Sequence, residues 1–147
     1  VYLKLVGVLD ESGMEPVQNR IEKLPFMDWR QLPAVIAGLD INLMPLENSL
    51  FHWCKSENKW TEAALVKVPS VMSRNCEMEY VVENGKDGWM CTTKEEWVNA
   101  LEALVTDEKA RKAMGEAAHQ KVMEHYLTVN TGKDAMEELL CSESYTK

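Results

Sequence analysis

Residues 40–65 read DINLMPLENSLFHWCKSENKWTEAAL and predict a strand, a polar loop and a helix in direct succession. The strand covers residues 39–44 and is stopped by Pro45, which cannot donate to a strand ladder. The loop of residues 45–54 has no clear period, and a helix is expected over residues 56–66 with Ser56 as its N-cap. Free backbone N–H groups and the positive end of the helix dipole would then face the strand end, which is a natural phosphate site.

Short apolar runs alternate with helical patterns on both sides of this stretch. Further strands are expected over residues 3–8, 17–24, 68–73 and 89–91. Further helices are expected over residues 29–37 with a break near Pro33, over residues 77–83, after a capping box of Thr93 and Glu96, over residues 107–126 and over residues 130–140. This alternation is typical of βα units, so the sequence predicts an α/β domain with a five-stranded parallel sheet flanked by helices.

The composition narrows the classes of partner. The chain has 147 residues, 46% hydrophobic and 27% charged, which suits one compact domain. Its formal charge of −8 disfavours binding to nucleic acid or to anionic lipid. No apolar run approaches the roughly 20 residues of a membrane-spanning helix. The widely spaced cysteines form no Cys-x-x-Cys pair, so we expect reduced thiols in a cytoplasmic protein and no metal site.

The start of the helix after the polar loop carries candidate ligand-binding side chains. Lys55 lies just before it and Lys59 lies in its first turn, where a cation is unfavourable unless an anion offsets it. The alternative is that both lysines are solvated or paired with Glu57 and Glu62. Glu62, in the second turn, has only acceptor sites and can hold two adjacent hydroxyls such as those of a ribose. It is also a normal surface residue.

In open parallel sheets, ligands bind beyond the carboxyl ends of the strands. This rule directs attention to the loops after Val8, Met44 and Ser73. Arg74 follows one of these strand ends and could reach such a crevice, but an arginine at a strand end is more often a solvated charge. A flavodoxin-like domain would instead place phosphate contacts after the first strand, where Asp10 disfavours an anion.

A longer residue pattern extends from residues 40–65 into the rest of the chain. It reads Asp-Ile-Asn-Leu-x-Pro-Leu-Glu-Asn-x-x-Phe-x-x-x-Lys-Ser-Glu-x-Lys-x-x-Glu-Ala-Ala-Leu, and continues with Val-Pro-Ser-Val-x-Ser at 68–73, Asn-Gly-Lys-Asp-Gly at 84–88 and Glu-Glu-Trp at 95–97. The pattern resembles the C-terminal domain of GT-B glycosyltransferases of family 4. The resemblance extends over residues 3–126 and is most specific in residues 40–65.

This resemblance implies a Rossmann-like domain that binds the nucleotide half of a nucleotide-sugar donor. It also implies a hexosyltransferase-type enzyme of polysaccharide biosynthesis that retains anomeric configuration and transfers to a saccharide or lipid-linked acceptor. The donor would be a UDP-, GDP-, ADP- or dTDP-sugar, with no metal and no further cofactor. Expulsion of a nucleoside diphosphate without a metal requires fixed cations and N–H dipoles, and Lys55 would take this catalytic part.

The family's site residues carry over onto matching positions of this chain. Glu62 corresponds to the second Glu of a Glu-x7-Glu motif and would hold the ribose hydroxyls, while Lys55, Ser56 and Lys59 would lie against the diphosphate. The loop facing the donor sugar would consist of Glu47, Asn48, Ser49, Leu50 and Phe51. The chain departs from the motif at Cys54, where the family often has its first Glu.

The resemblance also bears on domain organisation. Residues 1–147 would be a single donor-nucleotide-binding domain, lacking the first βα unit of its family and belonging to a larger two-domain enzyme. The N-terminal GT-B domain that supplies the acceptor site would be missing, so the isolated chain is expected to be inactive. The full-length protein is expected in the cytoplasm, with peripheral attachment to the inner membrane face as an option. The alternative function is a non-catalytic nucleotide- or sugar-binding accessory module of the same fold.

Overall fold

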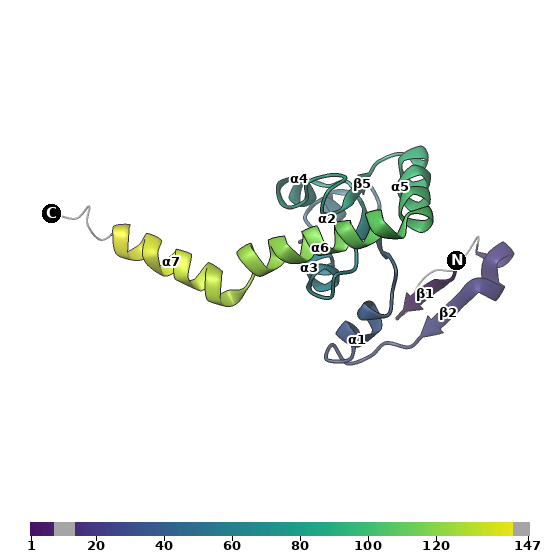
Figure 1. The fold of residues 1–147 in the computed structure, drawn as a ribbon, viewed down its shortest axis with the longest axis horizontal. Coiled ribbons are helices and arrows are strands. Elements are labelled where there is room, and N and C mark those ends of the chain that lie inside the picture. The colour runs from purple at the N-terminus through teal and green to yellow at the C-terminus, as the bar shows by residue number, and fades with distance from the viewer. Residues whose placement is uncertain (8–13, 143–147) are drawn as a thin grey trace. The chain divides into compact units, whose positions relative to one another are not determined.

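The computed structural model describes residues 1–7 and 14–142, with the elements labelled in Figure 1. The chain divides into two compact units, Val1–Val35 and Ile36–Lys147. Helices flank parallel sheets in an α/β fold, as the sequence predicts. The described strands form a two-stranded sheet in the first unit and a three-stranded sheet in the second, instead of the one five-stranded sheet expected.

The first unit contains two short parallel strands. β1 (Leu3–Val6) pairs with β2 (Ile21–Leu24), and a 3-10 helix, η1 (Glu15–Arg20), precedes β2. The expectation of one strand over residues 17–24 is therefore wrong in its first half. Pro16 lies in the first turn of η1, where its fixed φ fits a helix and its missing N–H has no helical acceptor to lose.

The second unit contains the three other strands. β3 (Asn42–Met44), β4 (Ser70–Ser73) and β5 (Trp89–Cys91) are parallel and lie in the order β3-β4-β5, close to the predicted positions. Helix α1 (Leu32–Ala37) spans the division between the two units. Pro33 lies in its first turn and does not break it, because a proline is tolerated where no intrahelical donor is needed.

Six helices follow in the described part of the second unit. They are α2 (Leu50–Trp53), α3 (Asn58–Leu65), α4 (Cys76–Val81), α5 (Lys94–Thr106), α6 (Glu108–His125) and α7 (Thr128–Ser142). The predicted capping box before α5 is confirmed, with Thr93 and Glu96 exchanging hydrogen bonds. α2 was not expected, since its single turn lies in the segment predicted as loop. Within the described residues, no helix has the length and apolarity needed to span a membrane.

The three-stranded sheet is buried on both faces because alternate residues of β4 enter different clusters. Met72 packs in a cluster with residues of α3, α4 and α6, including Trp60 and Val122. Val71 packs in a second cluster with residues of α5 and α6, including Leu104. Successive strand residues point to opposite faces, so this sheet lies between helical layers (Figure 1).

The buried residue Asp87 holds α3 and α6 to the turn before β5. Asp87 is 3% exposed and lies in the turn before β5. Its carbonyl accepts the indole N–H of Trp60 at 2.9 Å, and its carboxylate accepts the Glu83 N–H at 2.8 Å and pairs with Lys121 at 2.8 Å. These bonds join α3 and α6 to the turn, so α3 keeps its inner face on the sheet and its opposite face outward.

Candidate functional site

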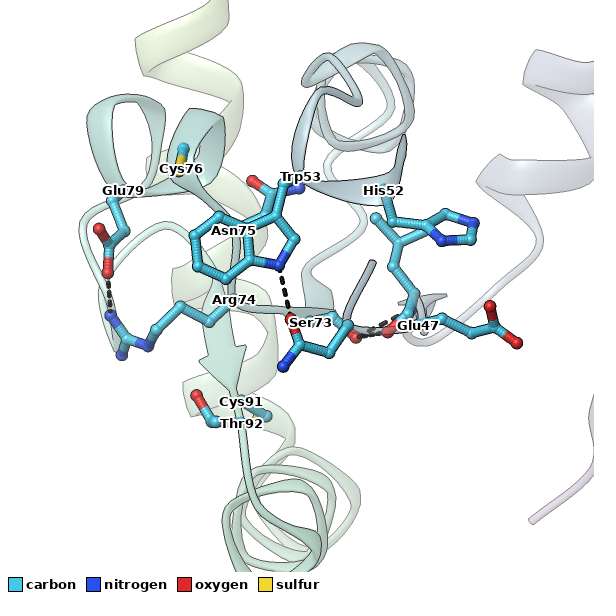
Figure 2. A pocket seen from close by; sticks show the side chains of 12 residues that line it. Glu47, His52, Trp53, Ser73, Arg74, Asn75, Cys76, Glu79, Cys91 and Thr92 are labelled. Atoms are coloured by element: carbon cyan, nitrogen blue, oxygen red, sulfur yellow. Dashed lines mark hydrogen bonds and ion pairs between the residues drawn. The ribbon is translucent and has the colours of Figure 1, made fainter. Parts of the chain in front are cut away.

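A pocket of about 310 Å³ opens at the carboxyl ends of β3, β4 and β5 (Figure 2). This is the end of a parallel sheet at which ligands are expected. The residues that line it come from the segments that follow the three strands and from α2 and α4: Leu46, Glu47, Asn48, His52, Trp53, Ser73, Arg74, Asn75, Cys76, Glu79, Cys91 and Thr92. All of them belong to the second unit.

Hydrogen bonds between the strand ends hold one wall of the pocket together. The Ser73 hydroxyl accepts the N–H of Leu46 at 2.8 Å and donates to the Leu46 carbonyl at 3.1 Å, so the segment after β3 is tied to the end of β4. The Arg74 N–H donates to the Cys91 carbonyl at 3.0 Å and ties the end of β4 to β5. The three segments therefore form one wall.

The short helix α2 supplies an aromatic wall. Ser49 caps it, with the hydroxyl 2.8 Å from Nδ1 of His52. The indole N–H of Trp53 donates to the side-chain carbonyl of Asn48 at 2.7 Å. This bond fixes the orientation of the indole and satisfies its donor, and Trp53 remains 45% exposed beside the pocket (Figure 2). A fixed aromatic ring is available to stack against a ligand.

One ion pair dominates the charge of the pocket. The guanidinium of Arg74 lies 3.0 Å from the carboxylate of Glu79 on α4. Among the described residues that line the pocket, the basic ones are Arg74 and His52, and the carboxylate of Glu47 points away from it (Figure 2). Arg74, which the sequence left open as a solvated charge, therefore lies at the pocket with a defined partner.

The β5 side of the pocket holds an uncharged thiol. Cys91 is buried, and this burial raises the pKa of its thiol, an effect that the nearby Glu96 strengthens and that Arg74 opposes. Hydrogen bonds from the N–H groups of Thr93 and Thr92 hold the pKa of Glu96 below its usual 4.5. Glu96 is thus an anion held by the backbone of Thr92 and Thr93. Cys91 stays a neutral thiol at neutral pH, because its pKa is raised.

Asn75 carries an unsatisfied donor at the pocket wall. It caps α4, and its side-chain carbonyl accepts the Met78 N–H at 2.8 Å. Its amide nitrogen Nδ2 is buried and has no hydrogen-bond partner within the described residues. Buried polar groups are nearly always hydrogen-bonded, so an unpaired amide beside a pocket calls for an acceptor from outside the protein.

The residues predicted to bind a nucleotide lie outside this pocket, on the segment that enters α3. Lys55, Ser56, Lys59 and Glu62 are all exposed. The prediction of Ser56 as N-cap is wrong, because α3 begins two residues later with Glu57 in the cap position. Glu57 makes no side-chain cap bond, so the first N–H groups of α3 keep free donors at an exposed helix start.

The charged side chains of this segment are unpaired with one another. Neither Lys55 nor Lys59 forms an ion pair within the described residues, and the Glu62 side chain has no partner there. The ammonium of Lys55 instead lies 4.2 Å from the ring centre of Phe51. Of the alternative interpretation, the pairing with Glu57 and Glu62 is absent from the described structure, whereas the exposure of both lysines agrees with solvated side chains.

The predicted sugar-facing loop is divided between two places. Glu47 and Asn48 are among the residues that line the pocket, although the carboxylate of Glu47 points away from it (Figure 2). Ser49, Leu50 and Phe51 form the cap and first turn of α2 and do not line it. Leu50 and Phe51 are exposed by 83% and 68%. The loop after Val8, a third predicted ligand position, lies outside the described residues.

Sequence reasoning missed most of the pocket. It identified the segments after Met44 and Ser73, but not the one after Cys91, and it named no role for Trp53, Asn75 or Glu79. The strand-end rule was the available signal, applied to every predicted strand. Among the described residues, no group of three or more His, Cys, Asp and Glu side chains is placed to hold a metal ion.

The chain resembles one family of known sequences. The model of the family described as glycosyl transferases group 1 matches residues 1–107. None of the curated protein sequences matches the chain. Because the family model covers well over half of the chain, the match shows membership.

Solved structures share the fold. The C-terminal domain of a glycosyl transferase group 1 family protein from Francisella tularensis has a TM-score of 0.58 and 18% identity over 77% of this chain and 57% of that one. Anabaena HepE in complex with UDP and glucose has a TM-score of 0.74 and 18% identity over 94% of this chain and 40% of that one. WaaG, a glycosyltransferase involved in lipopolysaccharide biosynthesis, has a TM-score of 0.71 and 17% identity over 91% and 37%. The chain thus spans less than two thirds of each, and the likeness shows a Rossmann-like α/β fold.

Proposed function

The chain belongs to the family of group 1 glycosyl transferases, and we propose that it binds the nucleotide-sugar donor of a two-domain enzyme. The observation that carries this proposal is the exposed start of α3. There, free backbone N–H groups lie beside Lys55 and Lys59, two cations without an ion-pair partner in the described structure. Unpaired donors and cations at one helix N-terminus favour a diphosphate.

Glu62 supplies the second part of this site. It lies one turn deeper on the outward face of α3, where its carboxylate is exposed and free of partners within the described residues. A carboxylate with free acceptor sites can take hydrogen bonds from the two hydroxyls of a ribose. Ser56, also exposed, would add a hydroxyl beside the phosphates. The segment therefore offers groups for both the charged and the sugar portion of a nucleoside diphosphate.

The proposed reaction is transfer of a hexosyl group with retention, as in GT-B enzymes of family 4. The chain would be the C-terminal domain, and an N-terminal domain would bring a saccharide or lipid-linked acceptor. Negative charge develops on the leaving diphosphate in the transition state. Lys55, assisted by the α3 N–H groups, would stabilise that charge, which is the chemistry needed when no metal takes part. The enzyme would act in the cytoplasm or at the inner membrane face.

The test measures binding of nucleoside diphosphates to the full-length protein by calorimetry. UDP, GDP, ADP and dTDP are titrated into the wild type, and the one that binds is titrated into Glu62→Gln. We expect at least tenfold weaker binding in the variant, because a hydrogen bond to a charged group contributes about 1.5–3 kcal/mol. Glu102→Gln, an equal charge change on exposed α5, is the control. Equal affinity in both variants, or no binding of any of the four, would reject the proposal.

A further inference from the structure

We propose that the pocket at the strand ends selects an uncharged sugar, and that Glu79 enforces this choice by occupying Arg74. The inference rests on the proposed function, because the sugar would arrive on the nucleotide held at α3. None of the predicted nucleotide-binding residues lines the pocket, so the pocket is free for another portion of the ligand. The main chain links the two sites, since Lys55 N–H donates to the carbonyl of His52, a residue of the pocket wall.

The wall has the chemistry of a carbohydrate site. Trp53 presents an indole whose N–H is already bonded to Asn48, so that the ring can take the apolar face of a sugar. Asn75 and Thr92, which carry an amide and a hydroxyl group, also line the pocket. The pocket volume of about 310 Å³ lies at the lower end of the range for small-molecule sites. One small ring with hydroxyl groups fits this combination better than a large planar base with phosphates.

The amide of Asn75 requires an acceptor. Its buried Nδ2 has no partner in the described structure, while the capping bond to Met78 holds the side-chain carbonyl in place. Rotation of the side-chain amide by half a turn would break the capping hydrogen bond to Met78, so it offers no partner for Nδ2. A sugar hydroxyl or ring oxygen that enters the pocket can accept this bond.

The charge of the wall decides between neutral and acidic sugars. Arg74 is the natural partner for a carboxylate, because its guanidinium can donate two parallel hydrogen bonds. Glu79 already holds that guanidinium at 3.0 Å, and the pair together is neutral (Figure 2). Among the described residues, no lysine and no second arginine lines the pocket, so an incoming uronic acid would meet Glu79 as a like charge. A neutral sugar meets no such penalty.

The ion pair itself is half exposed. The side chains of Arg74 and Glu79 are 38% and 53% exposed, and pairs of this kind contribute little to stability. Replacing Glu79 by Gln removes the charge and keeps an acceptor for Arg74. The fold should therefore survive, while the guanidinium becomes available to a ligand carboxylate.

The experiment compares two donors that differ by one carboxylate. The nucleoside diphosphate that binds the full-length protein is used as its hexose and its hexuronic acid conjugate, and both affinities are measured by calorimetry. We expect the wild type to favour the hexose conjugate. In Glu79→Gln, the ratio of hexuronate to hexose affinity should rise by about tenfold, since a like charge at close range is removed. Glu77→Gln, on the same helix but outside the pocket, should leave the ratio unchanged.

A second variant shows whether Arg74 receives the carboxylate. The gain in Glu79→Gln should disappear in the double variant Arg74→Gln/Glu79→Gln. A ratio that is equal in wild type and Glu79→Gln overturns the inference. So does a rise of equal size in Glu77→Gln, which would be a general effect of surface charge.

Free sugars separate this inference from the proposed function. Glucose and glucuronic acid, which carry no nucleotide, are titrated while the amide NMR signals of Cys91 and Thr92 are followed. Perturbation by glucose at these positions, with a response to glucuronic acid that appears in Glu79→Gln, supports the pocket even where no nucleoside diphosphate binds. Absence of any perturbation by glucose, together with normal nucleotide binding, overturns the sugar pocket and leaves the proposed function standing.

Discussion

One wall of the pocket at the strand ends lies directly before the start of α3 along the chain. The polar groups of the two sites are nevertheless held differently. In the pocket, Ser73, Trp53 and Arg74 are bonded to protein partners. At the start of α3, the side chains of Lys59 and Glu62 have no partner within the described residues. The pocket thus has a fixed shape, whereas the α3 segment presents unpaired charges. Shape suits selection among similar ligands, and unpaired charge suits capture of an anion.

The largest expected effect comes from removing the buried side chain of α3, because both sites depend on this helix being held against the sheet. Trp60 is 0% exposed and bonds through its indole N–H to Asp87, so Trp60→Ala should lower the free energy of unfolding by about 4 kcal/mol. Urea denaturation measures the loss. Trp29→Ala removes an indole that is 71% exposed and should change stability by no more than about 0.5 kcal/mol. Equal effects of the two substitutions would show that α3 is not held as described.

A smaller loss is expected where α6 approaches the end of α3. A Cβ on Gly115 would clash with the backbone carbonyl oxygen of Lys67, so the backbone must move in Gly115→Ala. We expect a loss of about 3 kcal/mol, at the upper end of overpacking effects. Gly132→Ala, in α7, meets nothing within 4 Å and should be neutral or stabilising by up to about 1 kcal/mol. Thermal unfolding of both variants checks the contrast, which fails if Gly115→Ala is tolerated.

Substitution of one basic residue in each site tests whether diphosphate binding at α3 is separate from ligand selection in the pocket. Lys55→Met should weaken binding of a nucleoside diphosphate by about tenfold, since it removes a charge-assisted contact worth about 1.4 kcal/mol or more. Arg74→Met should change this affinity by less than about twofold, because Arg74 is already paired with Glu79 and lies in the other site. Calorimetry with the free diphosphate measures both. A stronger effect from Arg74→Met would reverse the assignment of the two regions.

The smallest effect concerns the acid end of the stability curve. Bonds from Thr93 and Thr92 lower the pKa of Glu96 in the folded state below 4.5. Their contribution is therefore fully present above the unfolded pKa and is lost as pH falls below about 4.5 through the folded value. Glu96→Gln should flatten the decline of stability between about pH 6 and about pH 3. Glu95→Gln is the control, and an unchanged slope in Glu96→Gln would contradict the expectation.

Much of the fold could be predicted from local patterns. The buried positions of α6, namely Met114, Ala118 and Val122, follow the four-residue spacing seen in the sequence. The Thr93 and Glu96 capping box and the strand over residues 89–91 are also where the sequence places them. These signals are local, because hydrophobic periodicity and capping act within a few turns of the chain.

Other features could not be predicted because the local signal favoured a different position or element. Ser56 and Glu57 both precede α3, and serine is the better N-cap on propensity, yet the helix begins after Glu57. The position of α3 is fixed by Trp60, which must reach Asp87 across the core. Likewise, residues 17–20 belong to a sequence that alternates like a strand, but they form the end of a 3-10 helix that begins at Glu15. Tertiary packing outweighs local preference in such cases.

The sequence by itself determined an α/β chain with parallel strands, a helix start rich in cations, and an exposed carboxylate one turn deeper. These features were predictable because hydrophobic periodicity, helix-capping residues and local charge depend on residues that are close in the sequence. Only the tertiary structure decided that Leu46, Ser73 and Cys91 meet in one pocket and that Arg74 lies against Glu79 there. Parallel strands need long connections, so their carboxyl ends bring together residues far apart in the chain. A local sequence pattern does not predict which of those side chains line the same pocket.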